Sequence, residues 1–308
     1  MPGAIEVHRS SVQTWECDAM GHLNVQFYVD KAVQGLAALG VHLGLVPDDL
    51  RERGCLLGVE EQHIRFLREQ RPGAPFFVRA GVLDLDVADG HLLVLEELVS
   101  ASTDTVAASF VTRSRLFDAR SRAPLPMSEA LAGRVSAYRV DLPAHAGPRG
   151  LEPHLPRPRP RLAEAEALAM FSTYQACVDD SQCDAFGFMT TRHYMGAVAD
   201  SIPNLVLHMT GVDRSEGGRI GGAALEYRFV YHSVPRSGDV LTLRSGLVHV
   251  ADKAYTICHW LFDLATGEAV ATAEAVAITM DLETRRAIAI PDALRERLQK
   301  LVIPGLSL

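Results

Sequence analysis

One short motif occurs twice in the chain at a fixed distance. A Cys-Asp-Ala-Met-Gly run at residues 17–21 is followed by Tyr28, and a Cys-Asp-Ala-Phe-Gly run at residues 183–187 is followed by Tyr194, with every matched residue displaced by 166 positions. A constant offset of this size in a 308-residue chain indicates two copies of one domain. The repeated element is an acidic turn ahead of an apolar helical pattern, and turns of this kind often carry function.

The repeat sets the domain organisation. Arg65-Phe66 in a strand-like run of the first copy matches Arg228-Phe229 in the second, and each copy spans about 130 residues, an ordinary domain size. Between the copies, the alternating proline and arginine residues at 155–161 are incompatible with a helix or a sheet. We therefore predict an N-terminal domain over residues 1–140, a solvated linker over 141–161 and a C-terminal domain over 162–308.

Both copies show the same order of elements. Apolar residues at helical spacing predict one helix over residues 26–39 and another over about 191–207, which Pro203 should end or kink. Four strand-like segments follow each helix, at 56–67, 76–85, 91–99 and 106–117, and then near 224–232, 240–250, 254–264 and 269–280. A single helix beside consecutive antiparallel strands predicts an α+β fold in which the sheet wraps the helix.

The composition is that of a globular protein. Hydrophobic residues make up 48% of the chain, no basic and apolar N-terminal signal is visible, and no apolar run is long enough to cross a membrane. We therefore expect a cytoplasmic protein without a membrane partner. The five cysteines form no Cys-x-x-Cys pair, and their odd number argues against a disulfide framework, so we expect buried free thiols and no metal.

The net charge of the chain restricts the kinds of ligand that it can bind. A net charge of −8 argues against nucleic-acid binding, which needs a basic surface. A local cluster of arginines can still hold the phosphates of a small ligand. Arg65, Arg68 and Arg71 form such a cluster in the sequence.

The first copy of the motif resembles a known family. Its Asp-x-x-Gly-His-x-Asn run at residues 18–24, followed by Tyr28, resembles the acyl-CoA thioesterase branch of the hotdog-fold superfamily, including the 4-hydroxybenzoyl-CoA thioesterase type. Residues 61–82 and 226–248 resemble the central strands of that family. The resemblance covers both copies and implies a tandem, or double, hotdog.

The resemblance also implies a chemistry for the turn. In these thioesterases the carboxylate, here Asp18, attacks the thioester carbonyl or activates a water molecule, and a backbone N–H near Asn24 and Val25 receives the developing oxyanion. The physical basis is sound, because a helix N-terminus offers unpaired N–H groups and the positive end of the helix dipole. His22 is the candidate that orients Asp18, polarises the carbonyl or moves a proton to the thiolate. Asn24 is a further catalytic candidate, which could hydrogen-bond the substrate.

Each of these residues has an alternative role that the sequence leaves open. Asp18 is also a suitable turn or helix cap, Asn24 a suitable helix cap, and His22 a suitable hydrogen-bonded turn residue. Tyr28 is expected to pack in the core. Cys17 is expected to be unreactive, because a reactive thiolate needs a basic neighbour.

The second copy keeps the acid and loses its polar neighbours. His22, Asn24 and Gln26 are replaced at the matched positions by Phe188, Thr190 and Arg192. We therefore expect the Asp18 site to be catalytic and the Asp184 site to be altered or silent. The alternative is a second site in which Asp184 works with Arg192 or His193.

Together these features predict an acyl-CoA thioesterase that releases a free acid and a thiol. Its substrate would be an acyl-CoA or an acyl-carrier-protein thioester, with coenzyme A as part of the substrate and no other cofactor, and by analogy the chain would form a homodimer. Two alternatives remain. One is a hotdog enoyl-CoA hydratase or dehydratase, although its usual Gly-Asp-x-Asn-Pro-x-His pattern is absent. The other is a non-catalytic protein that binds acyl thioesters.

Overall fold

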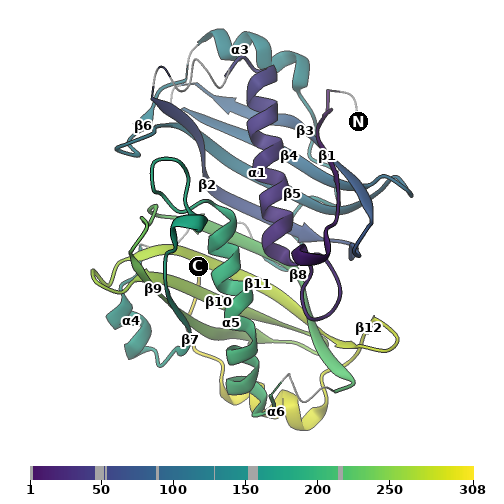
Figure 1. Ribbon diagram of the computed structural model, residues 1–308. Helices are drawn as coiled ribbons and strands as arrows, with labels where there is room; N and C mark the ends of the chain where they lie inside the picture. Colours follow the sequence, from purple (N-terminus) through teal and green to yellow (C-terminus); the bar gives the residue numbers. More distant parts are fainter. Residues whose placement is uncertain are drawn as a thin grey trace. The chain divides into compact units, whose positions relative to one another are not determined.

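The structure is a computed structural model that describes residues 3–45, 52, 54–87, 90–127, 129–151, 159–213 and 218–308. The chain divides into two compact units, Met1–Gly147 and Pro148–Leu308. Each unit contains one long helix and one antiparallel sheet (Figure 1). Residues 155–158 of the predicted linker run lie outside the described residues.

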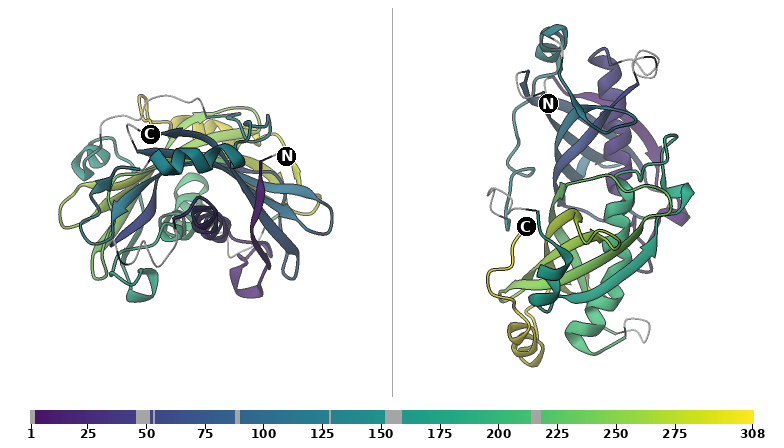
Figure 2. Two further views of the ribbon diagram at one scale, coloured as in Figure 1. Left: turned by 90° about the horizontal axis from the view of Figure 1, so that it is seen from above. Right: turned by 90° about the vertical axis from the view of Figure 1, so that its left-hand side faces the viewer.

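The N-terminal unit contains β1 (Ile5–Ser11), η1 (Thr14–Glu16), α1 (Val25–His42), β2 (Cys55–Phe66), β3 (Pro75–Asp86), β4 (His91–Ser100), β5 (Thr105–Asp118), β6 (Pro124–Leu125), α3 (Glu129–Val135) and η2 (Ser136–Tyr138). Its strands are antiparallel in the order β1-β3-β4-β5-β2, and β6 pairs with β5. The sheet curves around α1 (Figure 2).

The C-terminal unit repeats this arrangement. It contains α4 (Leu162–Ala167), β7 (Phe171–Cys177), η3 (Asp180–Gln182), α5 (Arg192–Thr210), β8 (Ile220–Tyr231), β9 (Val240–Val250), β10 (Ala254–Asp263), β11 (Ala269–Asp281), β12 (Arg286–Ala287) and α6 (Asp292–Lys300). The strand order is β8-β11-β10-β9-β7, and β12 pairs with β11.

The core of each unit lies between the helix and the sheet. In α1 the apolar stripe includes Leu36 and Leu39, which pack against Val82 of β3 and Leu92 of β4. In α5 the corresponding contact places Leu205 among residues of β9 and β10. The removal of these side chains from water is the main force that holds each helix against its sheet.

Most of the predicted elements are confirmed. α1 and α5 cover the two predicted helices, and β2 to β5 and β8 to β11 coincide with the eight predicted strands to within a few residues. α5 does not end at Pro203, however, but continues to Thr210. Leu205 and Met209, which follow the proline, are buried against the sheet, and this burial offsets the hydrogen bond that the proline cannot make.

Among the described residues, the short α-helices α3, α4 and α6 were not predicted. For α6 a signal was present in the sequence. Asp292 lies in its first turn and Arg297 and Lys300 lie in its last turn, which is the charge distribution that the helix dipole favours.

The ends of the predicted linker lie against the units. The carbonyl of Gly147 accepts from Nη1 of Arg65 at 2.6 Å, and Ala146 is buried. At the other end Arg159 Nε donates to the carbonyl of Ala269 at 2.6 Å. The described ends of this segment are therefore hydrogen-bonded to the domains while most of their residues are exposed. The exact domain limits stay a prediction.

The cysteines differ from one another in burial. All five are free thiols; Cys55 and Cys258 are buried, Cys17 and Cys183 are partly buried, and Cys177 is exposed. The expectation of buried thiols is therefore wrong for Cys177 and only partly right for the pair beside the acidic turns. Within the described ranges no helix is long and apolar enough to span a membrane.

Candidate active site

The acidic turn is a tight reversal closed by backbone hydrogen bonds. The N–H of Asp18 donates to the carbonyl of His22 at 2.9 Å, and the N–H of Gly21 donates to the carbonyl of Asp18 at 3.0 Å. Gly21 has a φ of +78°, a conformation that costs little only for glycine. Asp184 and Gly187 form the same turn in the second unit, with φ +77° at the glycine.

The Asp18 carboxylate caps its own turn through one oxygen. Oδ1 accepts a hydrogen bond from the N–H of Met20 at 2.8 Å, while Oδ2 makes no hydrogen bond to any described residue. In the second turn, Oδ1 of Asp184 likewise accepts from the N–H of Phe186 at 2.9 Å. Capping is therefore common to both copies, and the difference between the two turns lies in the residues around the acid.

His22 lies between two carboxylates. Its Nδ1 is 3.6 Å from Oδ1 of Asp18, and its Nε2 is 3.4 Å from Oε2 of Glu69. The residue is only 9% exposed, so the imidazole is held in a largely enclosed position. Both distances are longer than hydrogen bonds and within the range that a small side-chain movement would close.

Glu69 was not among the predicted site residues. It follows β2 in the loop that leads to β3, and the N–H of Leu23 fixes this loop by donating to the carbonyl of Gln70 at 2.8 Å. The sequence signal for Glu69 was weak, because an acid among arginines directly after a strand is common on protein surfaces.

The start of α1 supplies backbone donors. Asn24 is the helix cap, since its Oδ1 accepts from the N–H of Gln26 at 3.1 Å, and its carbonyl accepts from the N–H of Phe27 at 2.9 Å. The N–H of Val25 donates to no acceptor in the part of the chain that the structure describes. It is thus an unpaired donor at the positive end of the helix dipole.

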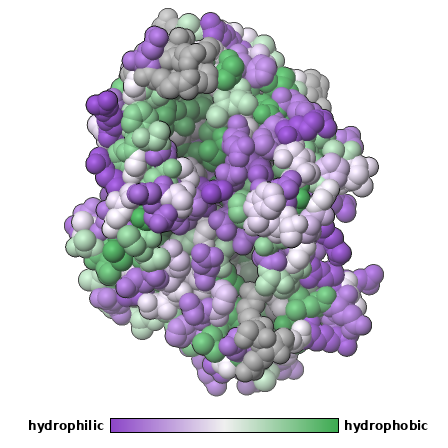
Figure 3. All heavy atoms as spheres, in the orientation of Figure 1, coloured by the Kyte–Doolittle hydropathy of each residue, from purple (hydrophilic) through white to green (hydrophobic). Residues whose placement is uncertain are grey.

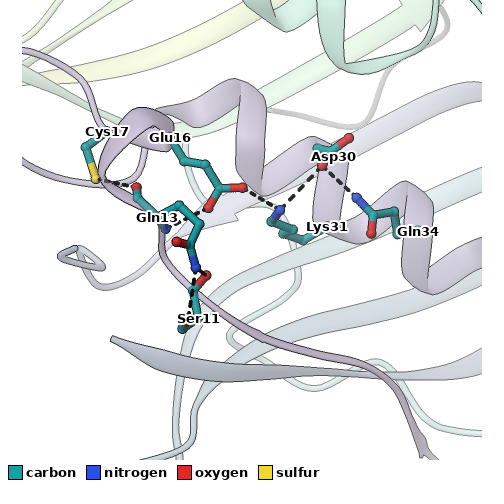
Figure 4. Close-up of polar contacts among 7 residues, drawn as sticks. All are labelled: Ser11, Gln13, Glu16, Cys17, Asp30, Lys31 and Gln34. Atoms are coloured by element: carbon teal, nitrogen blue, oxygen red, sulfur yellow. Dashed lines mark hydrogen bonds and ion pairs between the residues drawn. The ribbon is translucent and has the colours of Figure 1, made fainter. Parts of the chain in front are cut away.

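A buried ion pair joins α1 to the segment that precedes the turn (Figure 4). Lys31 Nζ lies 2.6 Å from Glu16 Oε1, and both residues are less than a tenth exposed. The other oxygen of Glu16 accepts from the N–H of Gln13 at 3.0 Å, and the carbonyl of Glu16 accepts from the N–H of Asn24 at 2.8 Å. These contacts fix η1 against the start of α1, and the sequence reasoning did not identify them.

The tyrosine of each motif packs in the core. Tyr28 is 4% exposed, donates to the carbonyl of Arg68 at 3.3 Å and meets Phe66 edge to face at 5.3 Å. Tyr194 meets Tyr231 edge to face at 5.1 Å. Tyr231 therefore occupies the place of Phe66 in the second unit, and the predicted match of Phe66 with Phe229 is wrong by two residues, a slip that keeps each side chain on the same face of the strand.

The three predicted phosphate-binding arginines do not share one surface. Arg65 is 7% exposed and its Nη1 donates to the carbonyl of Gly147 at 2.6 Å. Arg68 and Arg71 are exposed, and neither guanidinium makes an ion pair or hydrogen bond with a described residue.

The second turn lacks the groups around Asp18. Phe188, in the place of His22, lies under the guanidinium of Arg236, whose Cζ is 4.6 Å from the ring centroid. The N–H of Met189 donates to the carbonyl of Pro235 at 2.8 Å, as that of Leu23 does to Gln70, so Val234 takes the place of Glu69. Arg192 Nε donates to its neighbour His193 at 3.1 Å.

Cys17 is not an activated nucleophile. Burial raises the pKa of its thiol, and the nearby carboxylates of Asp18 and Glu16 raise this pKa further. Its Sγ donates to the carbonyl of Gln13 at 3.4 Å. The thiol form of Cys17 is therefore favoured over the reactive thiolate.

Comparison with solved structures identifies the fold. A protein from Lactobacillus plantarum named as an oleoyl thioesterase is 15% identical over 91% of this chain and 99% of its own, with a TM-score of 0.65. An acyl-ACP thioesterase from Bacteroides thetaiotaomicron is 12% identical over 89% and 98% of the two chains, with a TM-score of 0.63. The 12:0-ACP thioesterase of Umbellularia californica is 10% identical over 90% and 94%, with a TM-score of 0.66. The predicted double hotdog is confirmed.

Sequence comparison places the chain in a family. No curated protein is similar enough in sequence to match it. The model of the thioesterase-like superfamily matches residues 12–135 and again residues 178–298, one match in each unit. The chain therefore belongs to the thioesterase-like superfamily and is a thioester hydrolase.

Proposed function

We propose that this protein hydrolyses an acyl thioester at the turn of its N-terminal unit, with Asp18 as the nucleophile or general base. The observation that carries the proposal is the position of His22 between Asp18 and Glu69 beside the start of α1. The second turn keeps an acid in the same backbone setting without these neighbours. It is therefore the less suitable site.

Two routes fit this arrangement. In the first, the free Oδ2 of Asp18 attacks the carbonyl carbon, the thiolate leaves, and water then cleaves the mixed anhydride. In the second, Asp18 takes a proton from a water molecule that attacks the carbonyl directly. In both, one thioester and one water give one acid and one thiol.

The surrounding groups support either route. The unpaired N–H of Val25 is suited to stabilise the oxyanion that forms on the thioester carbonyl. His22 is suited to deliver a proton to the departing sulfur, and Glu69 to orient the imidazole. Asn24 contributes by capping the helix whose N-terminus supplies the donor.

The wider assignment is also a proposal. The substrates are acyl-CoA or acyl-carrier-protein thioesters. The sequence resemblance supports CoA as the carrier, and the structural relatives named as acyl-ACP thioesterases support the acyl-carrier protein equally. We propose a cytoplasmic homodimer that needs no cofactor beyond the carrier in its substrate, and that binds neither nucleic acid nor membrane.

The test is thiol release from a panel of acyl-CoA and acyl-carrier-protein esters. We expect Asp18→Asn to lower the rate of thiol release at least a hundredfold. Asp184→Asn should keep most of the wild-type rate, because His22 and Glu69 flank only Asp18. Circular dichroism and thermal unfolding of both variants control for folding. If the protein binds the esters and releases no thiol, the proposal fails, and hydration of enoyl-CoA esters then separates the hydratase from the pure binding protein.

A further inference from the structure

We propose that Trp15, Arg68 and Arg71 form a docking site for the adenosine phosphate end of coenzyme A, so that the carrier of the cleaved thioester is CoA. The thioester part of this inference rests on the proposed function. The binding of free CoA does not depend on the proposed function and can be measured separately.

Trp15 is unusual in its exposure. It is 75% exposed, whereas the other tryptophan, Trp260, is fully buried. The indole of Trp15 makes no hydrogen bond or ring contact with any residue in the described ranges. Hydrophilic side chains cover much of the face shown in Figure 3. A tryptophan as exposed as Trp15 is uncommon, because this residue is largely buried in most proteins.

The indole is presented from a fixed segment. Trp15 lies in η1. Its neighbour Glu16 is anchored by the buried ion pair with Lys31 (Figure 4) and by the hydrogen bond from the N–H of Asn24 to its carbonyl. Holding the backbone in place lowers the conformational entropy that a ligand would have to remove when it stacks on the ring.

The two arginines lie on a segment hydrogen-bonded to the one that carries Trp15. The N–H of Gly73 donates to the carbonyl of Val12 at 2.8 Å, and the N–H of Val12 donates to the carbonyl of Ala74 at 3.0 Å. The N–H of Ala74 also donates to the carbonyl of Arg71 at 3.0 Å. These bonds join the segment just before η1 to the end of the loop after β2, and the hydrogen bond from the N–H of Leu23 to the carbonyl of Gln70 joins the same loop to the acidic turn. The backbone that carries Trp15 and the loop that carries the two arginines therefore both lie beside the acidic turn.

The guanidiniums are available for an anion. Arg68 and Arg71 form no ion pair with any described residue, in a chain with a net charge of −8, whereas Arg65 is buried and its guanidinium donates to a carbonyl. Glu69 lies between them in sequence, and its carboxylate is directed to His22 at 3.4 Å. Two free arginines beside a free indole match a ligand that combines phosphates with an aromatic base.

The second unit does not repeat this combination of an exposed tryptophan and two exposed arginines. Ser181 stands at the position of Trp15, and Ser233 at that of Arg68, because Tyr194 donates to its carbonyl as Tyr28 does to that of Arg68. Arg236 keeps the charge of Arg71 but lies over Phe188. The candidate docking site therefore occurs only in the unit that also has His22, which links carrier recognition to the proposed catalytic turn.

Fluorescence provides a direct test, because one tryptophan is exposed and the other is buried. We expect CoA to quench the wild-type emission with saturation, 3′-dephospho-CoA to bind about tenfold more weakly, and pantetheine to have no effect. Trp15→Phe should remove the quenching and leave the emission of Trp260. Arg68→Ala and Arg71→Ala should each weaken CoA binding several-fold, and Arg120→Ala, which removes an exposed arginine from the β5–β6 turn, should not.

Kinetics identify the carrier. For Trp15→Ala we expect the ratio of kcat/KM for an acyl-CoA to that for the same acyl group on N-acetylcysteamine to fall about tenfold, because the second ester has no base to stack. The inference is overturned if CoA causes no quenching, or if the variant loses activity only toward the acyl-carrier-protein ester. If wild type cleaves no ester, the proposed function fails, and the fluorescence titration still decides whether CoA binds at Trp15.

Discussion

Nζ of Lys31 lies 2.6 Å from Oε1 of Glu16, and the pair is almost fully removed from solvent. The matched positions in the second copy hold the neutral Gln182 and Ala197. The ion pair is therefore a property of the N-terminal unit alone, where it connects the segment before the acidic turn to the helix after it. Since a buried charge is costly without its partner, the two residues should behave as a unit.

Lys31→Ala should destabilise the protein by about 3–5 kcal/mol, because it leaves the Glu16 carboxylate buried and unpaired. The double variant Glu16→Gln with Lys31→Ala reproduces the residues of the second copy and should be markedly more stable than the single variant. Urea unfolding of the two variants and of wild type checks this. If the single and double variants lose the same free energy of unfolding, the cost does not arise from the unpaired Glu16 carboxylate.

Asp18→Ala and Asp184→Ala should have the same structural effect and different catalytic effects. Each removes a carboxylate oxygen that accepts a backbone N–H in its turn, which should cost about 1 kcal/mol. Only Asp18→Ala should abolish thiol release. Asp18→Asn keeps the accepting oxygen and should recover most of the stability without the activity. A loss of activity in Asp184→Ala equal to that in Asp18→Ala would show that the second turn also works.

Glu69→Gln should lower kcat about tenfold with little change in KM, because the imidazole of His22 would lose the carboxylate that faces its Nε2. The loss should be absent when the substitution is made in a His22→Gln background, since Glu69 acts through that ring. Steady-state kinetics of the two single variants and the double variant measure this coupling. If the decreases in kcat of the two single variants multiply in the double variant, Glu69 acts independently of His22.

Glu96 should make the stability depend on pH. It is fully buried in β4 and accepts from Oγ1 of Thr112 at 2.6 Å, and burial raises its pKa to about 8, against the opposing effect of that hydrogen bond. The folded protein then holds a proton that the unfolded chain releases above its ordinary pKa near 4.5. The contribution of Glu96 to the free energy of unfolding should therefore fall between about pH 4.5 and pH 8, by at most about 1.4 kcal/mol per pH unit.

Glu96→Gln removes this titration and nearly preserves the shape of the side chain. Its free energy of unfolding relative to wild type should rise as the pH increases from 5 to 8, roughly the window set by the two pKa values. Denaturant unfolding at half-unit pH steps would detect the change. A constant difference between the two proteins across this range would mean that Glu96 is ionised in the folded state.

The sequence by itself determined the architecture. The offset between the two motifs gave the duplication, and the period of the apolar residues gave α1, α5 and eight strands, because burial of one face dictates that period locally. The helix cap at Asn24 and the positive φ at Gly21 are consistent with their residue types, since a cap and a positive φ are properties of a few consecutive residues.

Only the tertiary structure decided which distant residues meet. Glu69 reaches His22 because the loop after β2 is hydrogen-bonded to the acidic turn, and Lys31 reaches Glu16 because η1 folds back on α1. α5 continues past Pro203 because residues beyond it are buried on the sheet. In each case the deciding free energy comes from contacts between segments far apart in the chain, which local propensity and spacing do not encode.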